Sequence, residues 1–182
     1  AVELKEFNMK SKKFIEDGFQ LPKSKMQVTW RDKDHLFVAT DFGDGTMTES
    51  GYARIMKLWK RGTPLSEAKT LMEVSEKSVS IFAFRSGEGE DAKDFIVDSD
   101  TFWTQKYYQW VDGKVLHLDL PKTAEVNDFF QGQIIVSLKE DWQFQGRFLK
   151  EGTVLIIKPE VLTGQKAVVT DEDWNVFLQP KH

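Results

Sequence analysis

The 182-residue sequence contains no cysteine. This absence excludes a disulfide scaffold, a thiol nucleophile, an iron–sulfur cluster and a thiolate zinc site. Long apolar runs are absent as well: the longest have four residues (36–39, 81–84 and 154–157), whereas a membrane helix needs about 20. The N-terminal residues carry no apolar signal-peptide core. We therefore expect a soluble protein with no membrane partner, and we leave its compartment, cytoplasm or periplasm, open.

An excess of basic residues is also missing. The chain has 25 Lys and Arg against 29 Asp and Glu, a formal net charge of −4, and the two signs are interleaved along its length. Because affinity for nucleic acid rests on clustered Lys and Arg, no nucleic-acid partner is expected. The chain does contain 40% hydrophobic and 13% aromatic residues. These are enough to build a core in one or at most two domains.

Motifs of catalysis and metal binding are missing too. A serine hydrolase carries G-x-S-x-G at a sharp strand-to-helix turn, and this pentapeptide does not occur, since Ser50-Gly51 lacks the preceding glycine. The histidines, at 35, 117 and 182, are too far apart in sequence for a short-spaced metal motif. The acidic run 87–91 lacks calcium-loop spacing. We therefore expect no catalytic residue, no metal and no cofactor in this chain.

Apolar and polar residues alternate along most of the chain, which is the pattern of half-buried strands. Turn sequences such as Asp112-Gly113 separate the alternating segments, because glycine supplies the positive φ that tight hairpins need. Residues 65–68 and 159–162 favour a helix, each for about one turn. We expect strands near residues 3–8, 13–19, 26–30, 35–40, 53–60, 69–74, 78–85, 93–98, 103–110, 115–120, 125–130, 133–139, 153–158 and 174–179, with a small extra hairpin at 142–150.

These strands fall into groups of four, which predicts an all-β fold of partial β-propeller type with about three and a half four-stranded antiparallel blades. The expected division is a half blade at 1–22, then blades at 26–74, 78–120 and 125–180. A closed ring takes about four to eight blades, so the chain reads as a segment of a longer polypeptide. A single barrel or sandwich of the lipocalin or lectin sort is the alternative.

Aromatic residues gather between positions 102 and 110, and two interpretations compete for them. They could stack on a sugar or peptide ligand, because rings offer large contact area at low entropy cost. Both faces of a strand at 103–110 would be aromatic, however, and this favours packing between neighbouring blades. Core packing is therefore the preferred interpretation for Phe102, Trp103, Tyr107, Tyr108 and Trp110.

The segment from Trp30 to Lys69 contains the strings T-D-F-G and K-R-G-T-P-L. With these strings it resembles the N-terminal β-propeller of bacterial prolyl oligopeptidase family proteins. The resemblance extends upstream through 5–8 and 14–22 and continues more weakly through 102–108, 141–142 and 151–155. One departure is visible, since relatives usually have proline after S-G-Y, where this chain has Ala53.

The resemblance implies a two-part serine peptidase in which a propeller caps an α/β-hydrolase domain with a Ser-Asp-His triad. That family cleaves short peptides, often after proline, and the propeller restricts access by larger chains. None of the triad can be placed in this sequence, so the chain itself is expected to be noncatalytic. The expected partners are the hydrolase domain of the same parent chain and, in the full-length enzyme, a peptide substrate.

A free-standing β-barrel or lectin-like module that binds a small apolar or sugar ligand remains the alternative function. The lipocalin version predicts a Gly-x-Trp signature, which does not occur. For the propeller segment, blade edges without neighbours predict self-association.

The Gly-rich loop from Asp41 to Ala53 is the longest connection between two clearly predicted strands, and we expect it to be the most flexible. Its first three residues spell the DFG of protein kinases, but the other kinase motifs are missing. Loops at the rim of a scaffold are where binding residues gather, so this loop is the candidate cavity-facing or interface element. Its candidate residues are Asp41, Phe42, Gly43, Ser50, Tyr52 and Arg54.

Overall fold

A computed structural model describes residues 1–87 and 89–180. The chain divides into two compact units, the first from Ala1 to Ala83 and the second from Phe84 onward. Both are built almost entirely of antiparallel strands. The predicted all-β class is therefore confirmed. Within the described ranges, no helix has the length and apolar character needed to cross a membrane.

The first unit begins with two short strand pairs. Strand β1 (Val2–Lys5) pairs with β4 (Gln20–Ser24), and inside this pair β2 (Phe7–Asn8) and β3 (Lys13–Phe14) form a small hairpin. The sequence predicted continuous strands over 3–8 and 13–19. The structure interrupts both of them, because the pairing partner changes at Glu6 from β4 to β3 and the segment 15–18 closes a turn in which the N–H of Gly18 donates to the carbonyl of Ile15.

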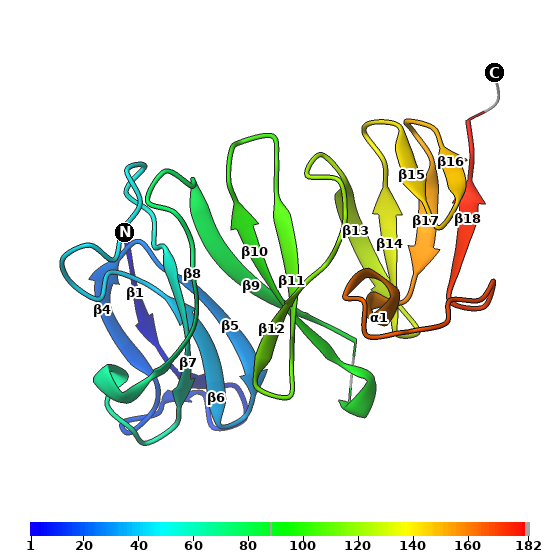
Figure 1. The fold of residues 1–182 in the computed structure, drawn as a ribbon. Coiled ribbons are helices and arrows are strands. Elements are labelled where there is room, and N and C mark those ends of the chain that lie inside the picture. Colours follow the sequence, from blue (N-terminus) through cyan, green and yellow to red (C-terminus); the bar gives the residue numbers. More distant parts are fainter. Residues whose placement is uncertain (88, 181–182) are drawn as a thin grey trace. The chain divides into compact units, whose positions relative to one another are not determined.

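A four-stranded antiparallel sheet follows, in the order β5-β6-β7-β8 (Figure 1). Its inner strand β6 is buried from Leu36 to Ala39, as a strand covered on both faces must be. The β7–β8 connection contains a 3₁₀ turn over Leu65–Glu67, where the sequence predicted a helical turn. The four strands are β5 (Gln27–Asp32), β6 (His35–Ala39), β7 (Ile55–Lys60) and β8 (Lys69–Glu73).

The N-terminal strands pack on one face of this sheet. Phe19 and Leu21, from the turn before β4 and from β4 itself, are each 3% exposed and belong to the same apolar cluster as Leu36, Val38 and Trp59. Phe19 meets Trp59 edge to face, with 4.9 Å between ring centroids. The segment before residue 25 therefore forms part of the core of the first unit.

The second unit contains a sheet in the order β12-β11-β10-β9. Strand β9, the first of these in the sequence, begins within the first unit. Two buried aspartates lie on β10 and both are paired. Asp94 accepts a hydrogen bond from Arg85 (2.6 Å), and Asp98 lies 3.3 Å from the ammonium of Lys106. The strands are β9 (Ser80–Ser86), β10 (Lys93–Ser99), β11 (Lys106–Val111) and β12 (Lys114–His117), and a short 3₁₀ turn spans Gly89–Asp91.

A third sheet has the order β13-β14-β17-β18, and a separate hairpin of β15 and β16 is inserted between its second and third strands. This hairpin is the extra one that the sequence predicted at 142–150. Helix α1 (Pro159–Leu162) matches the predicted helical turn. The strands are β13 (Glu125–Phe130), β14 (Gln133–Ser137), β15 (Trp142–Phe144), β16 (Arg147–Leu149), β17 (Val154–Ile157) and β18 (Trp174–Leu178).

Asp173, which is fully buried, fixes the segment between α1 and β18. One carboxylate oxygen accepts hydrogen bonds from the ammonium groups of Lys158 (3.0 Å) and Lys166. The other accepts from the N–H and the hydroxyl of Thr170, both at 2.9 Å. The hydrogen bond from Lys166, followed by those from the Thr170 backbone and Lys158, holds the pKa of Asp173 well below its usual range.

Within the second unit, its two four-stranded sheets meet through aromatic side chains. Phe84 stacks on Phe95 (5.1 Å between centroids), and Phe95 contacts Phe129 (4.5 Å). The prediction that residues 102–110 provide such packing is right for Tyr107, which is 6% exposed. It is wrong for two residues that lie in the turn before β11, Phe102 (82% exposed) and Trp103 (88% exposed).

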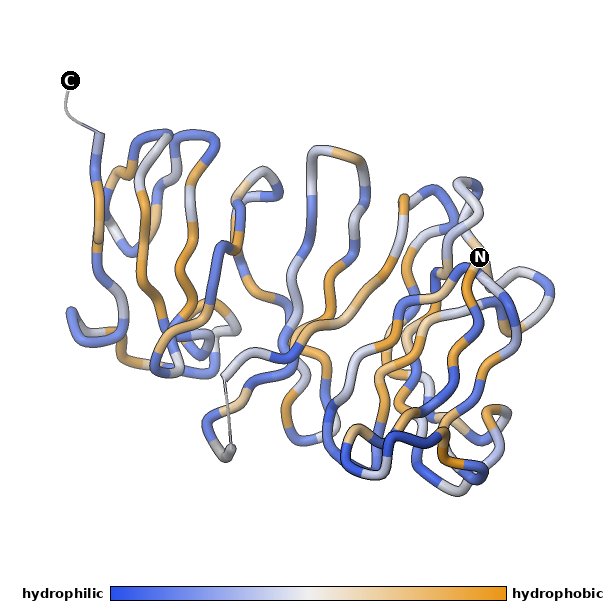
Figure 2. Tube along the Cα trace, turned by 180° about the vertical axis from the view of Figure 1, so that it is seen from behind, coloured by the Kyte–Doolittle hydropathy of each residue, from blue (hydrophilic) through white to orange (hydrophobic). Residues whose placement is uncertain are grey.

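Hydropathy along the backbone follows the strand arrangement. Apolar residues run along the strands of each sheet, and the connecting turns are mostly polar (Figure 2). Sheets of four antiparallel strands, of which the described residues form three, are what β-propeller blades are made of.

A substitution in the core of the first unit tests this packing. We expect Leu36→Ala, at a position that is 1% exposed, to lower the free energy of unfolding by about 2–5 kcal/mol, because a cavity is left in a close-packed cluster. Leu178→Ala, at a position that is 57% exposed, is the matched control and should cost less than about 1 kcal/mol. Urea unfolding measures both, and equal losses would contradict the assignment of the core.

Candidate functional site

The predicted loop connects β6 to β7 and begins with a hydrogen-bonded turn. The carboxylate of Asp41 accepts from the N–H of Gly43 (2.9 Å), and the hydroxyl of Thr46 accepts from the N–H of Phe42 (2.9 Å). Gly43 has φ +115°, in the region that only glycine enters without strain. The aspartate and the glycine of this D-F-G string therefore close a turn.

A second turn follows at residues 48–52. The N–H of Thr48 donates to the carbonyl of Tyr52 (2.7 Å), and the N–H of Gly51 donates to the carbonyl of Thr48 (2.8 Å). The buried hydroxyl of Thr48 donates to the carbonyl of Val79 (3.1 Å), which ties the loop to the chain before β9. The loop is thus held by its own hydrogen bonds and by a neighbouring segment.

Arg54 closes the base of the loop with three hydrogen bonds. Its Nη1 donates to the carbonyl of Gly45 (3.0 Å), its Nε to the carbonyl of Val74 (2.9 Å) and its Nη2 to the carboxylate of Glu73 (2.6 Å). The planar guanidinium can serve these acceptors together because its donors form a fixed fork. Arg54 is therefore a structural clamp that fixes the direction of the loop.

The candidate residues divide between the interior and the surface. Phe42 packs against the apolar cluster beneath the sheet, with the ammonium of Lys57 4.3 Å from its ring centroid. The side chain of Tyr52 is 41% exposed, and Asp41 and Ser50 are exposed. The structure brings Ser50 and Tyr52 together on the second turn, while Asp41 to Gly43 lie on the first.

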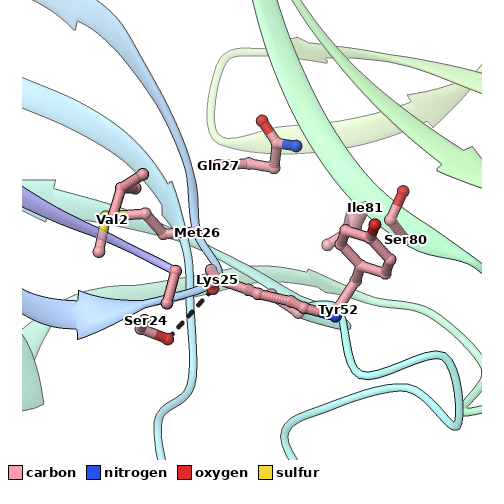
Figure 3. Close-up of a pocket in the computed structure, with 10 residues that line it drawn as sticks. Val2, Ser24, Lys25, Met26, Gln27, Tyr52, Ser80 and Ile81 are labelled. Carbon is pink, nitrogen blue, oxygen red and sulfur yellow. Dashed lines mark hydrogen bonds between the residues drawn. The ribbon is translucent and has the colours of Figure 1, made fainter.

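A small pocket of about 160 Å³ lies beside the second turn (Figure 3). Tyr52 forms part of its wall, and the ammonium of Lys25 lies 4.3 Å from the centroid of the Tyr52 ring, a cation–π contact. Its size suits a small apolar group beside one positive charge. Sequence reasoning missed the other lining residues because they come from distant segments; they include Val2, Met26, Ser80 and Ile81.

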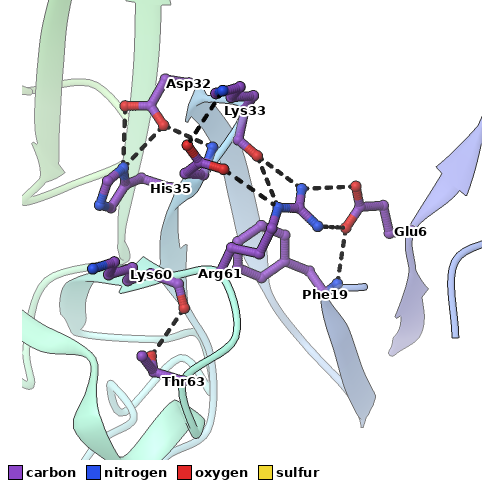
Figure 4. Close-up of polar contacts among 9 residues, drawn as sticks. Glu6, Phe19, Asp32, Lys33, His35, Lys60, Arg61 and Thr63 are labelled. Carbon is purple, nitrogen blue, oxygen red and sulfur yellow. Dashed lines mark hydrogen bonds and ion pairs between the residues drawn. The ribbon is translucent and has the colours of Figure 1, made fainter. Parts of the chain in front are cut away.

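A second polar centre in the same unit surrounds Arg61, in the β7–β8 connection (Figure 4). Its Nη1 and Nη2 donate to the two carboxylate oxygens of Glu6 at 2.7 and 2.8 Å, a bidentate pair. The guanidinium also donates to the carbonyl of Lys33 (3.0 and 2.8 Å) and lies over the Phe19 ring, 4.7 Å from its centroid. Arg61 thus joins the N-terminal segment to the β5–β6 turn.

The carboxylate of Glu6 is almost completely enclosed, with its side chain 9% exposed. It also accepts a hydrogen bond from the N–H of Phe19 (2.9 Å). The hydrogen bonds from Arg61 outweigh the effect of burial, so the pKa of Glu6 is lowered. The space is closely fitted, because a Cβ on Gly18 would lie 2.8 Å from the Cβ of Glu6.

Next to this pair, Asp32 organises the β5–β6 turn. It accepts hydrogen bonds from the N–H of Asp34 (2.8 Å), from Nδ1 of His35 (2.9 Å) and from Arg31. Partial burial by itself would raise the pKa of Asp32, but these donors together lower it to about 2. The ring of His35 is therefore engaged in the turn.

In the second unit, a concave pocket with a volume of about 500 Å³ lies beside the exposed rings of Phe102 and Trp103. The turn that carries them is held by Thr101, whose hydroxyl accepts from the N–H groups of Trp103 (3.1 Å) and Thr104 (3.0 Å). Lys122 and Glu125 contribute to the same wall.

Over the described part of the chain, no group of three or more His, Asp or Glu side chains could hold a metal ion. The candidate loop is a fixed surface loop with a small pocket beside it.

No family model matches the chain. It is 30% identical over 186 residues to the uncharacterized peptidase y4nA of Sinorhizobium fredii, covering 98% of this chain and 25% of that protein. It is 23% identical over 167 residues to the uncharacterized peptidase RP174 of Rickettsia prowazekii, covering 84% of this chain and 23% of that protein.

Among solved structures, the chain is similar to a post-proline cleaving enzyme from Rickettsia typhi, with a TM-score of 0.85 and 21% identity over 98% of this chain and 28% of that one. The chain thus spans about a quarter of the length of the relatives it matches. The structural match confirms the predicted partial β-propeller, and the matches together confirm the resemblance found at 30–69.

The enclosed pair of Glu6 and Arg61 makes a direct stability prediction. We expect Glu6→Gln to lower the free energy of unfolding by about 1–3 kcal/mol, because Arg61 then keeps a partly buried charge without its carboxylate. The control is Glu3→Gln, whose carboxylate is 55% exposed and pairs with Lys5 at 3.1 Å. It should change stability by about 0.5 kcal/mol or less. A cost for Glu6→Gln no larger than that of the control would contradict the structural role.

The lowered pKa of Asp32 predicts a particular acid response. Its folded-state pKa of about 2 lies below the ordinary value of 3.8, so ionised Asp32 stabilises the fold above about pH 4. This stabilisation is lost as the pH falls toward 2. After solvent screening we expect a contribution of about 1 kcal/mol. Unfolding curves of wild type and Asp32→Asn should differ at pH 6 and converge near pH 2; a constant difference would contradict the prediction.

Proposed function

We propose that this chain, a peptidase-related β-propeller domain of the prolyl oligopeptidase family, is the noncatalytic segment that limits substrate access in a serine peptidase. In the full-length enzyme it would contact the hydrolase domain of the same polypeptide. The observation that carries the proposal is the match over nearly the whole chain to peptidases about four times its length.

The absence of G-x-S-x-G from the sequence supports a noncatalytic role for this segment. A nucleophile needs a base within hydrogen-bond reach, and the hydroxyl of Ser50 is on an exposed turn with no such partner among the residues that the structure describes. The chemistry would therefore be supplied by another part of the parent protein.

The fixed loop supports the proposed control of access. Hydrogen bonds from Arg54 and Thr48 hold the loop in one orientation, while Asp41, Ser50 and Tyr52 keep exposed side chains. A rigid rim element of this kind can exclude large chains without losing entropy each time a substrate passes. We propose short peptides as substrates, and peptides that contain proline because the structural neighbour is a post-proline cleaving enzyme.

One observation favours a second candidate function. Phe102 and Trp103 are exposed on a fixed turn beside a concave surface, an arrangement that could stack a sugar or a small apolar ligand. Under this alternative the chain is a binding module that acts without a catalytic partner.

Peptidase activity separates the two candidates. We expect the intact parent protein to hydrolyse short proline-containing peptides and the 182-residue chain alone to show no hydrolysis, because the triad lies outside it. Activity in the isolated chain, or an intact parent that hydrolyses no peptide, would overturn the proposal.

The role of the loop is tested in the intact parent. We expect the combined variant Asp41→Ala, Ser50→Ala and Tyr52→Ala to change the KM for a peptide about threefold or more while kcat stays within about twofold, since the loop touches substrate and not the reacting groups. Lys60→Ala with Lys69→Ala, at exposed positions at the other end of β7 and β8 from the loop, is the control. An unchanged KM in the loop variant contradicts the proposed position of the loop.

A further inference from the structure

We propose that the β2–β3 hairpin and the apolar pocket beside it bind an acidic peptide segment that carries one large apolar side chain. This binding site would be additional to the proposed control of substrate access. It combines exposed aromatic rings, a small cavity and unpaired lysines in the first unit.

The apolar part of the site is a pair of rings on the hairpin. Phe7 and Phe14 are directly opposite each other across the two strands and meet edge to face, with 5.2 Å between centroids. They are 43% and 65% exposed, and the next apolar side chain, Met9, is 81% exposed. Large apolar groups that lie together at the surface mark interaction sites.

A cavity of about 150 Å³ adjoins this pair and shares Phe7 with it; its wall is mostly apolar and also includes Lys5 and Glu6. Phe19 and Leu36 form its buried wall, and Trp30, which is 48% exposed, stands at its edge. Phe19 and Trp30 meet edge to face at 5.6 Å. The cavity can take one aliphatic or aromatic side chain, which is how buried anchor residues are received at interfaces.

The charged part of the site is the hairpin turn, with Lys10, Lys12 and Lys13. All three side chains are exposed, and over residues 1–87 and 89–180 no carboxylate lies within ion-pair distance of any of them. Glu6, which precedes the hairpin, is already bound by Arg61 and by the N–H of Phe19. The turn therefore presents three lysines without ion-pair partners among the described residues, and the exposed Glu16 and Asp17 follow only after β3.

The turn is fixed before any partner arrives. The side-chain oxygen of Asn8 accepts hydrogen bonds from the N–H groups of Lys10 and Ser11, both at 2.9 Å. Lys12 is in the left-handed region with φ 55°. A fixed turn loses little conformational entropy on binding, so its lysines can contribute more of their attraction to affinity.

Charge complementarity selects an acidic peptide as the occupant. An anionic membrane would also attract lysines that lie among aromatic rings. The whole chain, however, carries a net charge of −4, which opposes approach to an extended anionic surface and matters less for a short peptide that meets only the hairpin. The apolar cavity adds a requirement for one inserted side chain, and a lipid headgroup does not supply it.

The test uses a fluorescein-labelled peptide of four Glu residues around one Leu, with fluorescence anisotropy as the readout. We expect binding to the 182-residue chain that weakens as salt increases, and at least about tenfold weaker binding when Glu is replaced by Lys or Leu by Ser. The combined variant Lys10→Gln, Lys12→Gln and Lys13→Gln should weaken binding about tenfold. The matched control Lys69→Gln, Lys77→Gln and Lys114→Gln removes the same charge elsewhere and should stay within about twofold.

Phe14→Ser tests the apolar part and should also weaken binding about tenfold, with circular dichroism confirming the fold; the lysine variants carry the test if this variant unfolds. The proposal is overturned if the acidic peptide binds no better than its lysine counterpart, or if both sets of lysine variants weaken binding equally. It is also overturned if phosphatidylcholine vesicles containing phosphatidylserine bind the hairpin while the peptide does not.

Discussion

The bidentate contact between Arg61 and Glu6 is the interaction on which the first unit depends. It joins residues 55 positions apart and brings together the N-terminal segment, the β5–β6 turn and the β7–β8 connection. Glu6 also accepts a hydrogen bond from the N–H of Phe19, so the pair helps to fix the segment from which Phe19 and Leu21 enter the core beneath the first four-stranded sheet. The pair is partly enclosed, so removing one member leaves the other as a partly buried, unpaired charge, which is costly. The Arg61–Glu6 pair therefore specifies how the N-terminal segment packs on the β5–β8 sheet.

A sheet held in this way can present loops in fixed directions. The loop between β6 and β7 begins and ends on inner strands of the sheet, and Arg54 and Thr48 fix its base and its second turn. The second unit uses the same device in a different form, since Asp173 collects donors from Lys158, Lys166 and Thr170 to fix the segment before β18. In both units a single buried or half-buried charged group orders a segment with little regular structure. This suits a domain whose proposed task is to shape access to chemistry carried out elsewhere in the polypeptide.

Much of this fold follows from local sequence pattern. The alternation of apolar and polar residues predicted the strands from β5 onward, and the short helical turns at 65–68 and 159–162 were predicted too. Both signals depend only on neighbouring residues in the sequence. The interruption at Glu6 was not predicted, because the pairing partner changes there from β4 to β3, and local alternation does not show which strands pair. Nor was the exposure of Phe102 and Trp103, since aromatic composition does not distinguish a strand interior from a turn. At the candidate site, the loop residues could be named from sequence, but the pocket lined by Lys25 and Ile81 could not, since it is assembled only by folding.

We propose that the β6–β7 loop of this propeller segment faces the catalytic domain of a peptidase. An experimental structure of the intact parent polypeptide would show where the loop lies. We expect the loop from Asp41 to Arg54 to border the cavity of a hydrolase domain that contains G-x-S-x-G. A structure in which this loop faces bulk solvent, away from any such domain, would contradict it.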